Sequence, residues 1–296
     1  MGVVEQYSIG RRLFISFNYT FLTAMSILCL FPIVHVLAVS FSDNAAAAGG
    51  LVTLWPVGFT TASYEYVLQQ GEFLDALYVT LQRVGIGVTV NMFLTILVAY
   101  PLSKEASAFR SRTAYAWIFV ITILFNGGLI PVYMTVKYTG LLDSIWALVL
   151  PGAVPVFNVI LLLNFFRNLP REMEEAAFMD GAGQWTTMWR IYVPLSLPSL
   201  ATITLFATVN HWNAWFDGLI FMNRPEHYPL QSYLQTIVVQ QDLSDIASQD
   251  LDLLAEINDR TFKAAQIFLG ALPILLVYPF LQRFFVKGIV LGSVKE

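Results

Sequence analysis

The sequence has few charged residues and a single cysteine. Only 12% of its 296 residues are charged, whereas 57% are hydrophobic, and a soluble domain usually carries about a quarter charged residues. Because Cys29 is alone, a disulfide within the chain and a metal site built from cysteines are both excluded. The net charge of −4 and the absence of any run of Lys and Arg argue against nucleic-acid binding. This composition predicts a membrane protein.

The sequence also lacks the residues that would hold a nucleotide or a metal ion. It contains no G-x-x-x-x-G-K-[ST] phosphate cradle, and no glycine is followed by lysine anywhere in it. His35 and His211 lie in apolar stretches and His227 lies outside them, without the spacing of metal ligands. We therefore expect no cofactor and no metal bound by this chain.

Long apolar runs are what the sequence does have. A membrane-spanning helix needs about 20 mostly apolar residues. Six segments qualify, at roughly 13–39, 74–102, 113–136, 142–166, 196–222 and 264–286. We expect an all-α membrane protein in which residues 1–296 form a single domain of six transmembrane helices. Between the helices, 40–73 and 223–262 form long outer loops and 167–194 forms a cytoplasmic segment.

The distribution of basic residues sets the expected orientation, because Lys and Arg concentrate in cytoplasmic loops. With the N-terminus inside, the inner segments hold 11 of the 16 Lys and Arg residues and the outer loops hold 4. The remaining one, Arg83, falls within the second span. The asymmetry predicts that both termini are cytoplasmic.

Residues 167–194 interrupt the apolar pattern with a short acidic helix. Pro170 disfavours helix at the residue before it, so the fourth span ends there. Acidic residues in the first turns favour a new helix through its dipole, and they are Glu172, Glu174 and Glu175. Gly181 ends that helix, since glycine tolerates a left-handed backbone. Apolar residues flanked by charge on the cytoplasmic side indicate a protein partner.

This segment resembles the EAA signature of ABC importer permeases. The signature reads Glu-Ala-Ala, three residues, Gly, nine residues, Ile, one residue, Leu-Pro. The chain has Glu175-Ala176-Ala177, Gly181, Ile191 and Val193-Pro194 in register, and it departs only in Val193 for Leu. In that family the segment is a coupling helix that docks on a separate ATPase subunit. The resemblance implies ATPase coupling by Glu174, Glu175, Ala176, Ala177, Phe178, Asp180 and Gly181, within residues 172–190.

Other stretches resemble one branch of this family. Residues 127–166, 211–221 and 228–234 are similar to carbohydrate importer permeases of the maltose-transporter type. Residues 272–296 are similar to the branch that imports polysaccharide fragments, including alginate and pectin oligosaccharides. The resemblance implies a type I ABC importer permease fold and a multi-pass protein of the bacterial cytoplasmic (inner) membrane.

The same resemblance implies partners. They are a second homologous permease, two copies of an ATPase subunit that carry the ATP and Mg, and an external solute-binding protein. The chain itself would be a channel-forming subunit and not an enzyme. Its substrate would be an oligosaccharide, with uronate-containing ones such as alginate among the candidates.

The residues themselves favour a sugar pathway at the end of the fifth span. Aromatic faces beside hydrogen-bonding groups suit a pyranose, and the candidates are Asn210, Trp212, Asn213, Trp215 and Asp217. The alternative is that these aromatics are packing or membrane-interface residues. Arg83 is a further candidate, because a basic group inside a span is costly and usually faces a cavity or a partner. It could pair with a uronate carboxylate, extend towards the outer surface or contact the other permease.

Two other classes of protein remain open from the residues alone. An integral membrane enzyme would need clustered carboxylates or a nucleophile and base at a membrane face, and the only inner acidic cluster is in the EAA segment. A stand-alone secondary transporter would favour internal repeats and several ionisable groups within the spans. The sequence shows neither.

Overall fold

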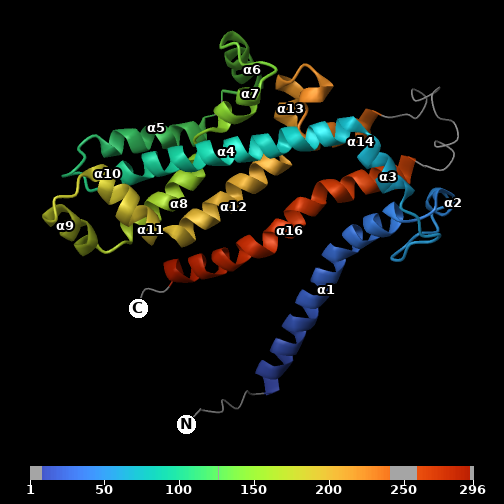
Figure 1. Ribbon diagram of the computed structural model, residues 1–296. Helices are drawn as coiled ribbons and strands as arrows, with labels where there is room; N and C mark the ends of the chain where they lie inside the picture. The colour runs from blue at the N-terminus through green and yellow to red at the C-terminus, as the bar shows by residue number, and fades with distance from the viewer. Residues whose placement is uncertain (1–8, 126, 241–258, 294–296) are drawn as a thin grey trace. The chain divides into compact units, whose positions relative to one another are not determined.

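The computed structural model describes residues 9–125, 127–240 and 259–293 (Figure 1), and every regular element in these ranges is helical. The chain divides into two compact units. One unit holds the chain up to Gln70 together with Gln240–Ala271, and the other holds Gly71–Val239 together with the chain from Leu272. We describe each unit by itself.

The first unit contains one long apolar helix and short connecting helices. Helix α1 (Ile9–Ser40) is followed by α2 (Asn44–Ala48) and α3 (Ala62–Gln69), and the unit includes the first part of α16 (Asp259–Ser293). Most apolar side chains of α1 are exposed, as expected for a helix whose solvent is lipid. A small core forms around α2, where the carboxylate of Asp43 accepts a hydrogen bond from the N–H of Ala45 at 3.1 Å.

The second unit is built around helix α4 (Gly71–Ser103). Helices α8 (Val156–Arg167) and α12 (Leu197–Asn213) both pack against α4 and against each other (Figure 1). Apolar side chains from all three helices fill the space between them, and this burial is the main favourable term in holding the unit together. The fully buried members of this core are Ala99, Leu162 and Ile203.

Shorter helices surround these three. Before α8 in the chain come α5 (Arg112–Leu124), α6 (Leu129–Tyr138), α7 (Ile145–Val149) and a 3-10 turn (Leu150–Gly152). After α8 come α9 (Arg171–Met179), α10 (Gln184–Thr187), a π-helix (Met188–Tyr192) and α11 (Val193–Leu195). Helix α12 is followed by α13 (Phe216–Phe221), a 3-10 turn (Pro225–His227) and α14 (Leu230–Gln240).

Three of the expected spans are single helices, and three are divided. The ranges 13–39, 74–102 and 264–286 lie within α1, α4 and α16. Range 113–136 is divided into α5 and α6, and range 196–222 breaks between α12 and α13. Range 142–166 bends by 49° ahead of α8, where Pro155 has no N–H to continue a helix.

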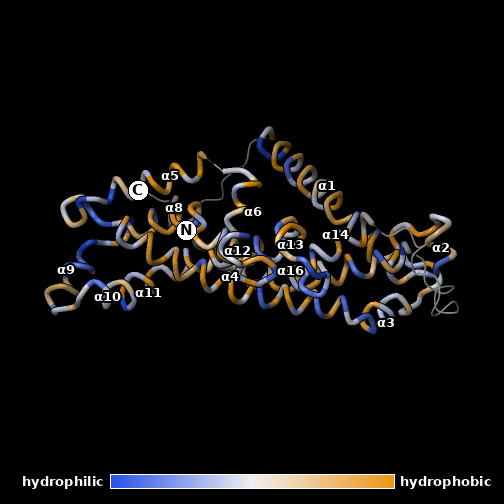
Figure 2. Tube along the Cα trace, turned by 90° about the horizontal axis from the view of Figure 1, so that it is seen from above, coloured by the Kyte–Doolittle hydropathy of each residue, from blue (hydrophilic) through white to orange (hydrophobic). Residues whose placement is uncertain are grey.

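By length and composition, the described part of the chain has three helices able to cross a membrane, or up to six if each bent pair is one span. Six spans therefore stay a prediction. Of the expected outer loop 223–262, residues 241–258 lie outside the described residues. The expected cytoplasmic segment 167–194 contains α9, α10 and the π-helix, and Figure 2 shows hydrophilic residues in and around α9.

Candidate functional site

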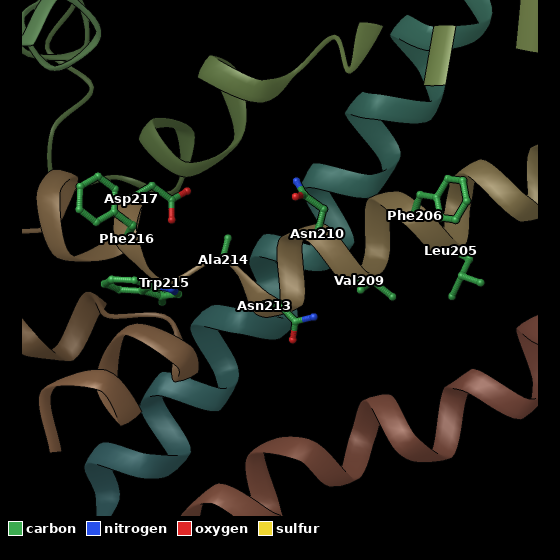
Figure 3. Close-up of a pocket in the computed structure, with 9 residues that line it drawn as sticks. All are labelled: Leu205, Phe206, Val209, Asn210, Asn213, Ala214, Trp215, Phe216 and Asp217. Carbon is green, nitrogen blue, oxygen red and sulfur yellow. The ribbon is translucent and has the colours of Figure 1, made fainter. Parts of the chain in front are cut away.

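The second unit has a cavity of about 720 Å³ at the break between α12 and α13. All its lining residues come from one continuous segment (Figure 3), and they are Leu205, Phe206, Val209, Asn210, Asn213, Ala214, Trp215, Phe216 and Asp217. The polar groups on this mostly apolar wall are the exposed amides of Asn210 and Asn213 and the carboxylate of Asp217. The rings of Trp215 and Phe216 meet edge to face, with centroids 5.6 Å apart. The cavity thus combines aromatic surface with a few hydrogen-bonding groups, which is the usual composition of a ligand site.

Close packing behind the cavity fixes the start of α13. A Cβ atom on Gly218 would lie only 2.1 Å from the Oγ of Ser232, so only glycine fits there. The Ser232 hydroxyl donates to the carbonyl oxygen of Trp215 at 2.7 Å. The carbonyl oxygen of Trp215 thereby keeps a hydrogen-bond partner where the helix is broken, and Trp215 as a residue stays 41% exposed.

Arg83 is buried and paired with Asp217. Its Nη1 donates to Oδ1 of Asp217 at 3.0 Å and to the carbonyl oxygen of Ala214 at 3.3 Å, and its Nη2 donates to Oδ2 of Asp217. The pair is therefore bidentate, the strongest geometry for these two groups. The Arg83 side chain is only 3% exposed, whereas that of Asp217 is 28% exposed and lines the cavity. The positive charge of Arg83 is compensated within the chain.

Further along α4, a second polar contact joins this helix to α12. The Nε2–H of His211 donates to Oδ1 of Asn91 at 2.9 Å, and the Asn91 amide donates to the carbonyl oxygens of Gly152 and Ala153 at 3.0 and 2.9 Å. A Cβ on Gly87 would lie 2.6 Å from the His211 ring. Asn91 therefore ties α4 to α12 and to the broken turn before α8.

The structure brings four of the six predicted pathway residues to the cavity. Asn210, Asn213, Trp215 and Asp217 line it, while Trp212 is 4% exposed and lies behind the wall, as does Arg83. Sequence reasoning missed Asn91 as a partner of His211. The signal was present as polar or small residues every three or four positions along α4, at Thr80, Arg83, Gly87, Asn91 and Thr95, all of which are buried.

The far end of α13 is tied to the turn before α7 through Asp143. The Asp143 N–H donates to the carbonyl oxygen of Phe221 at 2.9 Å. Its carboxylate accepts from the N–H of Asn223 at 3.0 Å and from Nδ1 of His227 at 2.8 Å. Asp143 has a positive φ of 60°, a conformation that costs free energy and persists only where contacts enforce it. Both ends of α13 are thus held in place.

The predicted coupling residues lie in and just after α9. Five of them present exposed surface, namely Glu175, Ala176, Phe178, Asp180 and Gly181. Ala177 is 7% exposed and packs inward. Gly181 has a φ of +79°, so the turn after the helix uses the left-handed conformation that glycine adopts without steric cost.

Glu174 differs from Glu175 in pointing into the second unit. Its Oε1 accepts from the Lys104 ammonium at 2.7 Å and its Oε2 accepts from the Tyr192 hydroxyl at 2.5 Å. The Lys104 Nζ also lies 4.0 Å from the centre of the Tyr100 ring and 4.1 Å from that of Tyr192. Burial lowers the pKa of Lys104, and the hydrogen bond and charge of Glu174 oppose that fall. We call Lys104, Glu174, Tyr192 and Tyr100 the Glu174 cluster.

Within the described ranges, no three His, Cys, Asp or Glu side chains lie close enough together to hold a metal ion. Charged groups beside α9 instead form two ion pairs, Lys104 with Glu174 and Arg171 with Glu105. A cavity of about 460 Å³ beside α9 is lined by Lys104, Arg112, Arg167, Arg171, Glu105, Glu174 and Glu175 among others. The described residues thus form a mixed-charge surface beside α9 and, separately, an aromatic cavity at α13.

Residues 7–290 match the family described as the inner membrane component of binding-protein-dependent transport systems. The chain belongs to this family. It is therefore a transport permease, an integral membrane subunit with no catalytic centre of its own, and the resemblance of the EAA segment is confirmed at the level of the family.

Individual relatives agree with this assignment. The chain is 38% identical over 290 residues to the polygalacturonan/rhamnogalacturonan transport system permease protein YtcP of Bacillus subtilis (strain 168), covering 96% of this chain and 99% of the relative. It is 32% identical to a chain in the crystal structure of a bacterial ABC transporter involved in the import of the acidic polysaccharide alginate. That match has a TM-score of 0.87 and covers 94% and 99% of the two chains.

A second solved structure shares the fold alone. It is a bacterial alginate ABC transporter in complex with an alginate pentasaccharide-bound periplasmic protein, 17% identical with a TM-score of 0.56, covering 91% of this chain and 93% of that chain. Together these matches show a type I ABC permease fold for the chain.

Proposed function

We propose that this permease forms half of the translocation pathway of an ATP-driven importer for uronate-containing oligosaccharides. The observation that carries the proposal is the cavity at the break between α12 and α13. Trp215 and Phe216 offer faces for the apolar side of a pyranose, and Asn210 and Asn213 offer amide donors and acceptors for hydroxyl and carboxylate groups. Relatives named for galacturonan and alginate import support the choice of sugar.

The charge arrangement supports recognition of the uronate by amides. Arg83 would have to leave Asp217 before it could meet a substrate carboxylate, and its side chain is almost fully buried. Breaking such a pair costs about 3–5 kcal/mol, more than one exchanged contact returns. In our proposal Arg83 holds α13 in place, and the amide N–H groups of Asn210 and Asn213 receive the acidic sugar.

The remaining parts of the machine would be separate polypeptides. The lining comes from one segment of this chain, which suits a cavity completed by a second homologous permease. The exposed face of α9, with Glu175, Ala176, Phe178 and Gly181, would dock on one of two ATPase subunits that bind the ATP and Mg. An external solute-binding protein would deliver the sugar, as the periplasmic protein does in the alginate complex. We propose six spans in the inner membrane with both termini cytoplasmic.

Affinity purification of the tagged chain in mild detergent, followed by mass spectrometry, tests this assembly. The proposal expects a P-loop ATPase and a second permease with the wild-type chain, and loss of the ATPase in Gly181→Trp. Gly50→Trp is the matched control, because Gly50 also has a positive φ but lies after α2. Recovery of the wild-type chain alone would instead favour a stand-alone secondary transporter or a membrane enzyme.

Uptake of radiolabelled sugars tests the substrate. Cells that express the complete importer should accumulate short oligogalacturonates, and Asn210→Ala with Asn213→Ala should weaken this uptake. Maltotriose serves as the neutral comparison. Equal uptake of both sugars by the wild-type importer, or an unchanged preference in the double variant, would contradict recognition of a uronate by these amides.

A further inference from the structure

Helix α4 is joined to its neighbours by two ion pairs. In its first half, Arg83 binds Asp217 of α13 at the cavity, and just beyond its end Lys104 binds Glu174 of α9. The helix between them is a single element from Gly71 to Ser103. At 1.5 Å per residue, the 21 residues from Arg83 to Lys104 span about 30 Å. One rigid helix therefore joins the cavity to the coupling segment.

The connection at the coupling end is built from buried groups. The side chains of Lys104 and Glu174 are 10% and 19% exposed. Tyr192 donates to the same carboxylate, and the Tyr100 hydroxyl on α4 donates to the Gln184 side chain at 2.7 Å. Separating α9 from α4 would leave a charge without its partner in a poorly hydrated site, which is strongly unfavourable. Helix α9 is thus bound to α4 more firmly than a surface contact would allow.

A second ion pair joins α9 to the residues just after α4, but it is exposed to solvent. Arg171 of α9 binds Glu105, the neighbour of Lys104, but these side chains are 74% and 57% exposed. Exposed pairs contribute little to stability, because water solvates both partners when they separate. The Glu174 cluster therefore holds α9 against the end of α4, and the exposed pair adds little to this contact.

We propose that Glu174 and Lys104 are positioning residues that make α4 move with α9, so that displacement of the coupling segment reaches α13 and the cavity. This rests on the proposed function, because it requires an ATPase that moves α9. It assigns neighbouring glutamates different tasks. Glu175 faces outward to the ATPase, and Glu174 faces inward and passes the motion to α4.

The test measures sugar transported per ATP hydrolysed by the complete importer in proteoliposomes, with the binding protein and oligogalacturonate supplied outside. Lys104→Met and Glu174→Gln should keep ATP hydrolysis but lower this ratio at least about fivefold, the lower end of usual coupling between sites. The matched controls Arg171→Met and Glu105→Gln should change the ratio less than about twofold. An unchanged ratio in Glu174→Gln would overturn the proposal, and this variant decides the matter if Lys104→Met fails to assemble.

Two further variants separate transmission from local damage. The exchange Lys104→Glu with Glu174→Lys restores the ion pair and should recover most of the ratio. The combination of Lys104→Met with Asp217→Asn, which breaks both ion pairs at once, should lower the transport ratio no more than the more severe single variant does. Sites about 30 Å apart normally act independently, so effects that multiply would contradict a shared path through α4.

The readouts also distinguish the two proposals. If no ATPase accompanies the wild-type chain, the proposed function fails and the positioning role fails with it. If the ATPase remains bound to every variant and the transport ratio stays at the wild-type value, the positioning role alone is wrong.

Discussion

Removing either partner of the Arg83–Asp217 pair should have unequal consequences for stability. Asp217→Asn leaves a guanidinium whose side chain is 3% exposed without its counter-ion, and an uncompensated charge of this kind costs about 3 kcal/mol or more. Arg83→Met leaves a carboxylate that is 28% exposed and still accepts the N–H of Gly218 at 2.9 Å. Because water reaches that carboxylate, the expected loss is about 1–2 kcal/mol.

The double variant Arg83→Met with Asp217→Leu should be more stable than Asp217→Asn alone. Replacing a buried pair by apolar residues of similar volume is often neutral, so we expect it within about 1 kcal/mol of the wild type. The free energy of unfolding would be measured by titrating the purified permease from mild into denaturing detergent. Arg171→Met, which removes one member of an exposed pair, is the control and should change the value by less than about 1 kcal/mol.

The ranking of the three variants by free energy of unfolding shows which charge is costly to leave unpaired. If Arg83→Met proves as damaging as Asp217→Asn, burial of the guanidinium is not the governing cost. If the double variant is the least stable of the three, the pair contributes net stability, and the desolvation argument for this site is wrong.

Three other substitutions have definite expected outcomes. Gly87→Ala places a Cβ 2.6 Å from the His211 ring, so the α4–α12 contact should lose about 1–3 kcal/mol, seen as a lower unfolding midpoint in the same titration; an unchanged midpoint would show that the ring can move aside. Gly181→Ala puts a side chain at φ +79°, which costs about 1–2 kcal/mol at the turn after α9. Pull-down should therefore recover less ATPase with Gly181→Ala than with the control Gly183→Ala, because Gly183 has an ordinary φ of −78°. Trp215→Ala should raise the apparent KM for oligogalacturonate uptake about fivefold, or about 1 kcal/mol, without shifting the unfolding midpoint; the same KM as the wild type would remove this ring from the binding site.

Much of the helical pattern could be predicted from hydropathy, because lipid selects long apolar runs regardless of tertiary context. Continuous α1 and α4 follow directly from that rule. The division of 113–136 and of 142–166 depends on local backbone chemistry, which a count of apolar residues does not register. Pro155 illustrates this, since it interrupts backbone hydrogen bonding without lowering the apolar character of the run.

The pairings within the site were beyond sequence reasoning for a different reason. Arg83 was recognised as costly within a span, but its partner lies 134 residues later in the chain. Likewise the spacing of the EAA segment indicated a coupling helix without telling Glu174 from Glu175. The difference arises only because Lys104 and Tyr192 meet one face of α9. Contacts between distant segments, rather than local propensity, decide these roles.

The separation of Arg83 from Asp217 also bears on how the protein is made. Translation delivers α4 to the membrane well before α13 exists, so each nascent chain passes through a stage in which Arg83 has no counter-ion. Insertion of an arginine at the centre of a span costs about 2.5–3.5 kcal/mol on biological scales, and the apolar residues of α4 must offset that cost alone. The ion pair can therefore form only after α13 has been synthesised, and a chain truncated before Asp217 lacks the counter-ion of Arg83.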